Sequence, residues 1–414
     1  MATTTQPARP PAAGRVLAPD LARGLMLLLI ALANVPWHTA GSGSSGRTTY
    51  DPDASLADRV WQAVATAAVD GRSYPLFAFL FGYGIWQLYD RQVRTGTSPQ
   101  EAHRLLRRRH AWMLVFGAVH AALLWGGDIL GAYGLVGLLV CWLLLDRRDR
   151  TVAVWAGALG GLLAVAAVVT VVAGVLVGAP EGPGAPADLP DPAAAEGYAA
   201  SVVLRSGMWA VVTLGQGLLT LAVPAAVLLG VLAARHGVLQ HPDRHRRLLL
   251  VTAATGIPLA WGAGTLAVAQ AAGAFPGIAP WTFDVLVVAT GLAGGLGYAA
   301  AFALVAAAWQ RRGLGRAGDA LVAVGRRSMT CYLLQSLLFA PVLAAWGLGF
   351  GTGLTDWQTA LYAVAVWLVT VAVAVWLDRA GQRGPFERLL RHLAYPRPTL
   401  SPAPTRDAST TRTG

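Results

Sequence analysis

The feature that most constrains this chain is a succession of long apolar segments separated by short polar loops. The hydrocarbon core of a bilayer is about 30 Å thick, so a helix needs roughly 20 mostly apolar residues to cross it. Segments of this kind occur at 21–37, 74–89, 111–125, 129–145, 152–177, 209–234, 248–271, 283–309, 329–348 and 357–377. Charged residues make up only 13% of the chain, whereas an ordinary soluble domain carries roughly 25%. The sequence therefore predicts an all-α polytopic membrane protein with about ten transmembrane helices.

The basic residues predict how these helices are oriented. All of them are arginines, and all but Arg47, Arg59, Arg72 and Arg205 fall in loops and tails on one side of the predicted helices. Short arginine-rich loops stay in the cytoplasm, so we expect both termini to be cytoplasmic. The use of arginine without lysine, with abundant alanine and glycine, fits a G+C-rich genome, and we expect a bacterial cytoplasmic membrane. The net charge of +11 is thus a topology signal within the lipid bilayer, and no nucleic-acid partner is expected.

The predicted domain organisation is a transmembrane domain with two tails. The ranges are 1–19 for the N-terminal cytoplasmic tail, 20–395 for the transmembrane domain and 396–414 for the C-terminal cytoplasmic tail. Within the domain, an N-terminal part (20–178) and a C-terminal part (199–395) are joined by an acidic, Pro- and Gly-rich extracytoplasmic loop at 179–198. Both tails are expected to be disordered.

Two further local features bear on the class of protein. Apolar residues at helical spacing predict a short helix at 58–68 that lies on the outer membrane surface. Cys141 and Cys331 both lie inside apolar runs, where a thiol behaves as a small hydrophobe. We therefore expect neither a disulfide framework nor a metal site.

A set of polar residues converges near the outer ends of the first four predicted elements. His38 ends the first helix, Arg72 precedes the second, His120 lies in the outer half of the third, and Asp128 and Tyr133 open the fourth. Ionisable groups inside a membrane are costly and are functional candidates by default. Such a set supports general acid or base chemistry, with Asp128 or Arg72 tuning a histidine. The alternative is that His120 only joins helices and that Asp128 only caps one.

Other polar and small residues have two interpretations each. Asn34 lies one turn before His38 on the same face of the first helix, and Thr330, Tyr332, Gln335 and Ser336 bring polar groups into the ninth. Such groups join helices or line a cavity. The pairs Gly82/Gly84, Gly157/Gly161 and Gly291/Gly295 predict close helix packing. The basic cluster 104–110 is explained by cytoplasmic retention of its loop or by binding of an anionic lipid or a nucleotide phosphate.

Several segments resemble the YeiB family of bacterial membrane proteins, which carry domain of unknown function 418. The matching segments, in chain order, are Asp20-Leu-Ala-Arg23-Gly24, Arg72-x-Tyr74-Pro-Leu-Phe77, Phe79-Leu-Phe-Gly82-Tyr-Gly84, His120, Leu124-Trp125-Gly-Gly127-Asp128-Ile-Leu130-x-x-Tyr133, Gly325-Arg326-x-Ser328-x-Thr330-x-Tyr332-Leu-Leu-Gln335-Ser336 and Gly384-Pro385-x-Glu387-x-Leu-Leu390-Arg391. Together these matches span nearly the whole chain.

The family is more distantly similar to transmembrane acyltransferases, which pass an acyl group from cytosolic acyl-CoA to an acceptor across the bilayer. In that group an arginine of the first helix is followed, after ten residues, by a histidine. Arg23 matches the arginine, but Asn34 stands at the histidine position. His38 or His120 would have to replace that base.

The leading hypothesis that follows is acyl transfer to an extracytoplasmic glycan or lipid. In it, Arg23, Arg326 or 107–109 holds the phosphates of acyl-CoA, the donor substrate, and no resident cofactor is expected. The catalytic candidates are His120, His38 and Asp128, and the substrate-binding candidates are Arg72, Asn34, Tyr133, Gln335, Arg23 and Arg326. A carrier for a small polar or lipid-like molecule and a non-catalytic scaffold are the alternatives. No oligomeric state is predicted.

The orientation is testable with fusions at two loops. A reporter enzyme that is active only outside the cytoplasm should be inactive when fused at Gly96 and active when fused at Ala185, because arginine-rich loops are not translocated. Equal activity at both positions would overturn the proposed outer grouping of His38, His120 and Asp128.

Overall fold

The computed structural model describes residues 17–39, 50–179 and 191–395, and within these ranges the chain is helical without β-strands. The elements are α1 (Leu17–Asn34), η1 (Val35–His38), α2 (Leu56–Val64), η2 (Ala65–Val69), α3 (Ser73–Arg94), α4 (Pro99–Leu123), α5 (Leu130–Leu143), α6 (Asp149–Val177), α7 (Tyr198–Leu214), η3 (Gly215–Leu219), α8 (Ala222–Arg235), α9 (Arg246–Ala271), α10 (Asp284–Arg312), α11 (Gly315–Arg326), α12 (Ser328–Leu343), η4 (Phe350–Gly353), α13 (Asp356–Arg379) and α14 (Pro385–Ala394). The all-α prediction is confirmed. The predicted tails lie largely outside the described residues.

Many of these helices have the dimensions and apolarity of membrane spans. Six are long and apolar enough to cross a bilayer: Leu17–His38, Asp149–Val177, Tyr198–Leu219, Arg246–Ala271, Asp284–Arg312 and Asp356–Arg379. Three apolar helices, α5, α8 and α12, are shorter. α6 exposes apolar side chains along its length, including Val165, Val168 and Leu176, as a lipid-facing helix does. The total of about ten spans and the cytoplasmic termini stay predictions.

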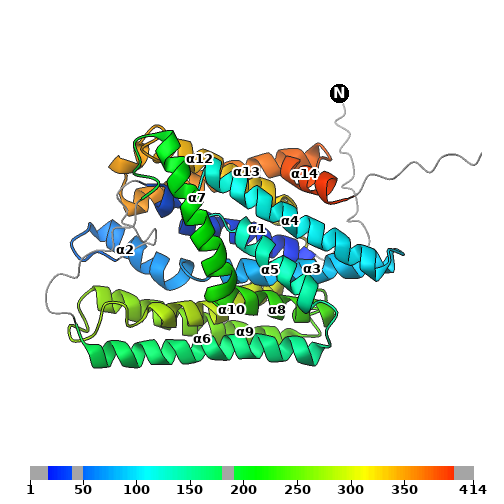
Figure 1. Ribbon diagram of the computed structural model, residues 1–414, viewed down its shortest axis with the longest axis horizontal. Coiled ribbons are helices and arrows are strands. Elements are labelled where there is room, and N and C mark those ends of the chain that lie inside the picture. Colours follow the sequence, from blue (N-terminus) through cyan, green and yellow to red (C-terminus); the bar gives the residue numbers. More distant parts are fainter. Residues whose placement is uncertain (1–16, 40–49, 180–190, 396–414) are drawn as a thin grey trace, which may run out of the picture.

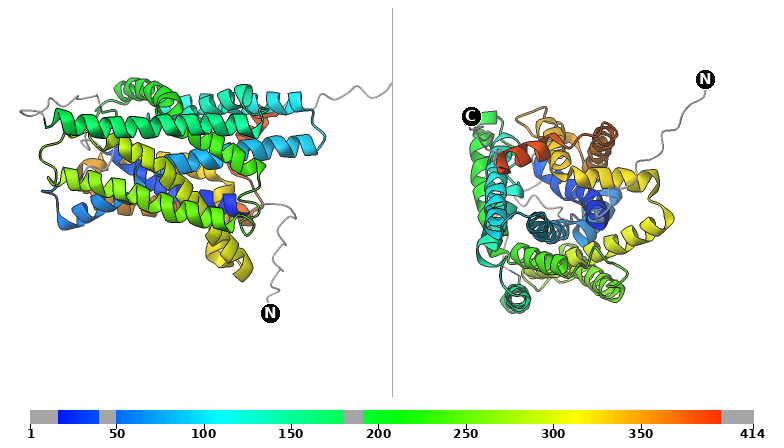
Figure 2. Two further views of the ribbon diagram at one scale, coloured as in Figure 1. Left: turned by 90° about the horizontal axis from the view of Figure 1, so that it is seen from below. Right: turned by 90° about the vertical axis from the view of Figure 1, so that its right-hand side faces the viewer.

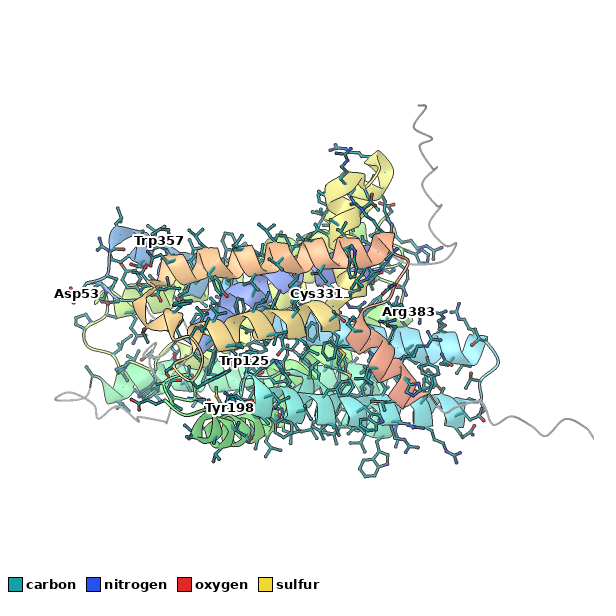
Figure 3. The ribbon with its side chains drawn as sticks, turned by 90° about the horizontal axis from the view of Figure 1, so that it is seen from above. Asp53, Trp125, Tyr198, Cys331, Trp357 and Arg383 are labelled. Atoms are coloured by element: carbon teal, nitrogen blue, oxygen red, sulfur yellow. The ribbon has the colours of Figure 1, made fainter. Side chains whose placement is uncertain are left out.

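The helices run between two chemically different ends of the bundle (Figures 1 and 2). Figure 3 shows Arg383 toward one end, and Asp53 and Trp357 toward the other. We call the first the basic end after Arg383 and after Arg235 at the end of α8, which bonds there to Asp149 and to the carbonyl of Arg147, at the start of α6. We call the other the acidic end after Asp53.

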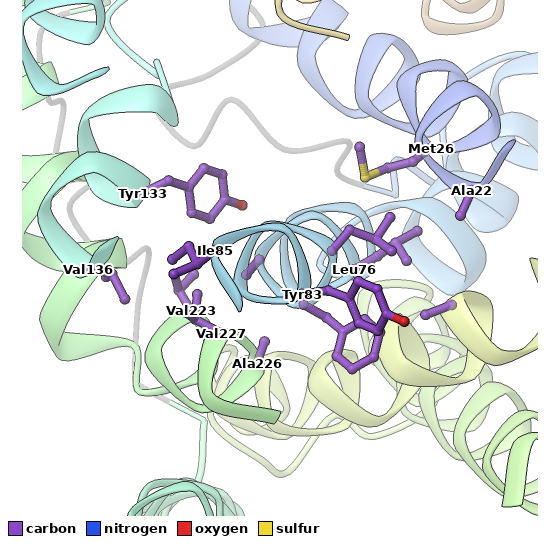
Figure 4. Close-up of a cluster of buried hydrophobic side chains, with 14 of the residues drawn as sticks. Ala22, Met26, Leu76, Tyr83, Ile85, Tyr133, Val136, Val223, Ala226 and Val227 are labelled. Atoms are coloured by element: carbon purple, nitrogen blue, oxygen red, sulfur yellow. The ribbon is translucent and has the colours of Figure 1, made fainter. Parts of the chain in front are cut away.

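Helix α3 occupies the centre of the bundle, and α1, α5 and α8 surround it (Figure 4). Its residues Leu76, Leu80 and Tyr83 are fully buried. Close approach to α8 depends on glycine, because a Cβ atom at Gly82 would overlap the carbonyl oxygen of Val227, and one at Gly230 would overlap that of Phe79. The packing role expected for Gly82 is therefore confirmed.

The other two glycine pairs differ in whether they lie at a packing contact. Gly291 faces the backbone of Gly71, and Gly295 faces the backbone of Leu76, so both lie at helix contacts as expected. By contrast, a Cβ atom at Gly157 or Gly161 would meet no atom within 4 Å. The packing role expected for that pair is wrong within this chain, because α6 turns this face away from its neighbours.

The single helix expected at 209–234 is also wrong, because the chain breaks there. The π-helical turn η3 ends α7, and Leu221 then adopts a left-handed conformation with φ 58° before α8 begins. Pro224 fits the first turn of α8, where a backbone N–H would have no acceptor within the helix, so its absence costs nothing. In a helix that continued from α7, the same proline would disrupt the hydrogen bonding. In Figure 1, α7 consequently crosses the direction of α6, α9 and α10 at a steep angle.

At the acidic end, the short helix expected at 58–68 is present as α2 and η2, and it holds the start of α13. Asp58 accepts a hydrogen bond from the Trp357 amide at 3.1 Å, and Gln62 donates to Asp356 at 2.6 Å. Burial opposes ionisation of Asp58, but hydrogen bonds from Ser55 and the Trp357 amide hold its pKa below the ordinary 3.8. The carboxylate therefore stays charged and caps α13.

Glycine contacts give a matched test of packing. Gly82→Ala should lower the thermal unfolding midpoint of the purified protein, because overpacking against a backbone carbonyl costs about 1–3 kcal/mol. Gly161→Ala adds the same methyl group in open space and should leave the midpoint unchanged or slightly raised. Equal midpoints for the two variants would contradict the α3–α8 contact.

Candidate functional site

The centre of the candidate site is a buried hydrogen bond between α4 and the turn before α5. His120 Nδ1 lies 2.7 Å from Asp128 Oδ1, and the exposed fractions of the two residues are 5% and 0%. With Asp128 ionised, its oxygen accepts the Nδ1 proton and the lone pair of the imidazole lies on Nε2. We call this contact the His120–Asp128 dyad.

The sequence around the dyad explains why it forms. The buried face of α4 carries residues at spacings of three and four, as one face of a helix does. These residues are Leu106, His110, Met113, Gly117 and His120. A Cβ atom at Gly117 would approach Asp128 Oδ2 to 2.5 Å, so glycine at this position makes room for the carboxylate.

Asp128 is held from three directions. Its Oδ2 accepts the Gly131 amide at 3.0 Å, which caps the first turn of α5. The Tyr332 hydroxyl of α12 donates to Oδ1 at 3.3 Å and accepts the Ile129 amide at 3.4 Å. Sequence reasoning named Tyr332 only as a helix-joining or cavity-lining residue. Its partnership with Asp128 joins the C-terminal part of the chain to the dyad.

His38 lies in the same cluster. Its ring centroid is 5.3 Å from that of Trp125 and 5.4 Å from that of Phe339, while His120 packs edge-on against Trp125 at 6.4 Å. His38 is 2% exposed and within electrostatic reach of His120. The structure therefore brings His38, His120 and Asp128 together, as the sequence predicted. Figure 3 shows Trp125 between the two ends of the bundle.

Buried side-chain atoms without a hydrogen-bond partner among the described residues occur in several parts of the bundle, as at Gln240 and Trp367, and five of them lie around the dyad. They are His38 Nε2, His120 Nε2, Trp125 Nε1, Trp209 Nε1 and Thr213 Oγ1. The last two adjoin Gly131, whose amide bonds to Asp128. Buried polar groups are rarely left unpaired, and exceptions concentrate where ligands or reacting groups bind. These atoms can accept or donate hydrogen bonds to a polar ligand.

Arg72 is placed differently from the expectation. It is fully buried, and its guanidinium donates to the carbonyl oxygens of Asp70 and Ala260. Its side chain also contacts the backbone positions of Gly264 and Gly294, on α9 and α10. It thus ties the start of α3 to α9 and α10, whereas the dyad lies among α4, α5 and α12. A substrate-binding role for Arg72 stays a prediction.

Two of the remaining expected residues, Tyr133 and Gln335, bond to backbone carbonyls of neighbouring helices. Tyr133 donates to the Tyr74 carbonyl at 2.9 Å and joins α5 to α3. Gln335 donates to the Leu27 carbonyl at 3.2 Å and joins α12 to α1. Asn34 is half-buried at the N-cap of η1, without a capping hydrogen bond from its side chain. Helix joining is the role that these contacts support.

Arginines expected to bind a donor lie at the basic end. Arg23 donates to the Leu80 carbonyl at 3.2 Å and lies 3.4 Å from Asp20. Arg326 lies 3.7 Å from both Asp20 and Asp378. Arg109 is within electrostatic reach of Arg23 and forms no ion pair with any described residue. Asp20 and Asp378 thus pair with Arg23 and Arg326, and Glu387 lies within electrostatic reach of Arg109.

The sequence set Arg205 apart as one of four arginines on the other side of the predicted helices, but it gave this residue no role at the site. Arg205 on α7 is 2% exposed, donates to the Ala122 carbonyl at 2.9 Å, and lies within 5.0 Å of the Tyr198 and Trp346 rings. It fastens the steep helix α7 to the end of α4, next to His120. The described residues contain no group of three or more His, Cys, Asp or Glu side chains that could hold a metal ion.

Fold and site together define a helical membrane protein with a histidine–carboxylate pair buried inside the bundle. Residues 233–397 match the family model described as protein of unknown function DUF418. The chain is 26% identical to the uncharacterized protein YxaH of Bacillus subtilis, over 91% of this chain and 93% of that protein. It is 41% identical to the uncharacterized protein YeiB of Escherichia coli over 70 residues, which cover 17% of this chain and 15% of that protein. Residues 233–397 thus resemble DUF418 proteins and the chain as a whole resembles YxaH, which confirms the predicted resemblance to YeiB-like proteins.

The position of Arg72 yields a stability prediction. Arg72→Met should lower the thermal unfolding midpoint markedly, because it removes two buried hydrogen bonds from a charged group, worth about 1.5–3 kcal/mol each. Arg91→Met, an exposed change at the end of α3, is the control and should have little effect. A stable Arg72→Met protein would instead point to a role in ligand binding.

Proposed function

We propose that this protein is a transmembrane acyltransferase of a bacterial cytoplasmic membrane in which the His120–Asp128 dyad is the general base. The donor is cytosolic acyl-CoA, and the acceptor is a hydroxyl group of an extracytoplasmic glycan or lipid. The observation that carries the proposal is the 2.7 Å contact of His120 Nδ1 with Asp128, together with an unpartnered, buried Nε2 atom.

The chemistry of the step fits these two residues. His120 Nε2 removes the proton of the acceptor hydroxyl, and Asp128 stabilises the imidazolium that forms. The acceptor oxygen then bonds to the acyl carbonyl carbon, the carbon–sulfur bond of the thioester breaks, and the CoA thiolate leaves. Tyr332 and the Gly131 amide keep the carboxylate oriented toward the imidazole.

The arginines at the basic end support an anionic donor. Arg109 and His120 lie on the same helix, and eleven residues of α-helix correspond to about 16 Å. The flexible arm of CoA can extend from Arg109, Arg23 and Arg326 toward the dyad, while its phosphates stay at the surface. Arginine suits this role because its planar guanidinium binds phosphate oxygens in pairs.

The dyad also supplies a general base, which the first helix lacks in comparison with the acyltransferase group. Asn34 stands where those proteins have a histidine, and among the described residues no hydrogen bond joins its side chain to a carboxylate. His120 reaches the cluster from α4 instead, and His38 lies against the same Trp125 ring. The proposal therefore assigns the base to His120 and a neighbouring, substrate-contacting position to His38.

The proposal predicts a specific loss of transfer. Purified protein in liposomes with radiolabelled acetyl-CoA should label a lipid or glycan fraction from a bacterial membrane, and His120→Ala should reduce the rate by about 10²–10⁴, the usual contribution of a general base. His103→Ala is the matched control, because His103 is on the same helix and lies 2.8 Å from Asp146 at the basic end. It should retain activity. Labelling that does not depend on His120 would end the proposal.

A second function is favoured by one observation, the break between α7 and α8 near the dyad. Broken helices and buried ionisable pairs are typical of secondary transporters. A carrier would accumulate a solute in sealed vesicles without consuming acyl-CoA, so the same liposomes distinguish the two functions.

A further inference from the structure

Helix α14 contacts the helix that carries Tyr332 through one acidic side chain. Glu387 Oε1 accepts the amides of Met329 at 2.9 Å and Thr330 at 3.0 Å, and its Oε2 accepts the Thr330 hydroxyl at 2.5 Å. The Thr330 hydroxyl in turn accepts the Phe386 amide at 3.3 Å. We call this set of contacts the Glu387 latch.

The latch replaces a cap that α12 does not have of its own. The first amides of a helix lack intrahelical partners, and a residue at the N-cap usually satisfies them. Arg327 occupies the N-cap of α12 and makes no side-chain cap. A carboxylate near a helix N-terminus is also favoured by the helix dipole. Glu387 therefore fixes the first turn of α12 from a separate helix.

The same turn leads directly into the dyad. Tyr332 lies two residues beyond Thr330 and donates to Asp128 Oδ1 at 3.3 Å. Because α12 is a continuous helix from Ser328, a shift of its first turn moves the Tyr332 hydroxyl. We propose that Glu387 is a positioning residue for the His120–Asp128 dyad, acting through α12 and Tyr332; its catalytic consequence rests on the function proposed above.

The bend before α14 is built around the latch. A Cβ atom at Gly384 would overlap both Glu387 Oε2 and Thr330 Oγ1, although the φ of −58° at Gly384 suits any residue. Glycine is required here for space and not for conformation. Pro385 then occupies the first helical position, as its fixed φ favours. The motif Gly384-Pro385-x-Glu387 is thus explained by one contact.

Other contacts hold α14 independently of the latch. Leu390 is 2% exposed and Ala394 is 1% exposed, and Gln92 of α3 donates to the Tyr395 hydroxyl at 3.3 Å. Arg388 is exposed on the same helix. Loss of Glu387 should therefore release the first turn of α12 without detaching all of α14, so a folded variant can be studied.

The two cysteines of the chain allow a direct test. Cys331 lies between Thr330 and Tyr332, is 1% exposed, and its thiol donates to the Thr370 carbonyl at 3.8 Å. In a Cys141→Ala background it is the single thiol. Glu387→Ala and Gly384→Ala should each speed maleimide labelling of Cys331 about tenfold or more, because several hydrogen bonds to the α12 turn are lost. Arg388→Ala is the control and should not differ from the parent.

A second readout separates positioning from simple stabilisation. The ring nitrogen signals of His120, assigned by their loss in His120→Gln, should shift in Glu387→Ala and Gly384→Ala in the direction that Tyr332→Phe produces. Glu387→Gln keeps an oxygen that accepts the backbone amides and should restore both readouts in part. Faster labelling with an unchanged His120 signal would overturn the proposal, as would unchanged labelling. Neither readout needs acyl transfer, so failure of the enzymatic function would be seen separately.

Discussion

The hydrocarbon core of a bilayer contains no hydrogen-bonding partner, so each polar group within it must be satisfied by the protein itself. Helices meet this requirement for most of the described backbone. The break between α7 and α8 meets it in part with the π-helical turn η3, where the Thr220 amide donates to the Gly215 carbonyl at 2.9 Å. Irregular backbone is tolerated at membrane depth only where protein encloses it. At this break Gly217 is buried while Leu218 and Leu219 are exposed, so protein encloses it on one side, and α7 crosses the bundle steeply (Figure 1).

Buried side chains are subject to the same requirement, and the buried arginines and histidines meet it with different partners. Arg72 and Arg205 are both deeply buried, yet each donates to backbone carbonyl groups of neighbouring helices. His120 and His38 have Nε2 atoms without a partner among the described residues, and the other nitrogen of His120 is bonded to Asp128. Hydrogen bonds from these two guanidinium groups to backbone carbonyls hold neighbouring helices together. A group with remaining hydrogen-bonding capacity can act on a ligand.

The dyad connects distant parts of the chain because three packing contacts converge on it. Gly117 leaves space for the Asp128 carboxylate beside α4, and Tyr332 approaches from α12, which Glu387 holds at its first turn. The N-terminal part of the chain thereby supplies the ionisable pair, and the DUF418 region supplies its support. This division explains why residues of both parts are needed for one candidate site.

The sequence by itself determined the class of protein and most of the central cluster. Helix length and apolarity are properties of contiguous residues, and ionisable groups such as His38, His120 and Asp128 stand out within apolar segments. Only the tertiary structure decided which groups pair. Tyr332 is 204 residues from Asp128, and Arg72, although near His38 in sequence, bonds to α9 instead. Hydropathy does not define the rotation of a helix about its axis, so it did not show the open face of Gly157 and Gly161. It also did not show the break at Leu221, because the segment is apolar on both sides of it. Partners are set by which helices pack together, and that is a property of the assembled bundle.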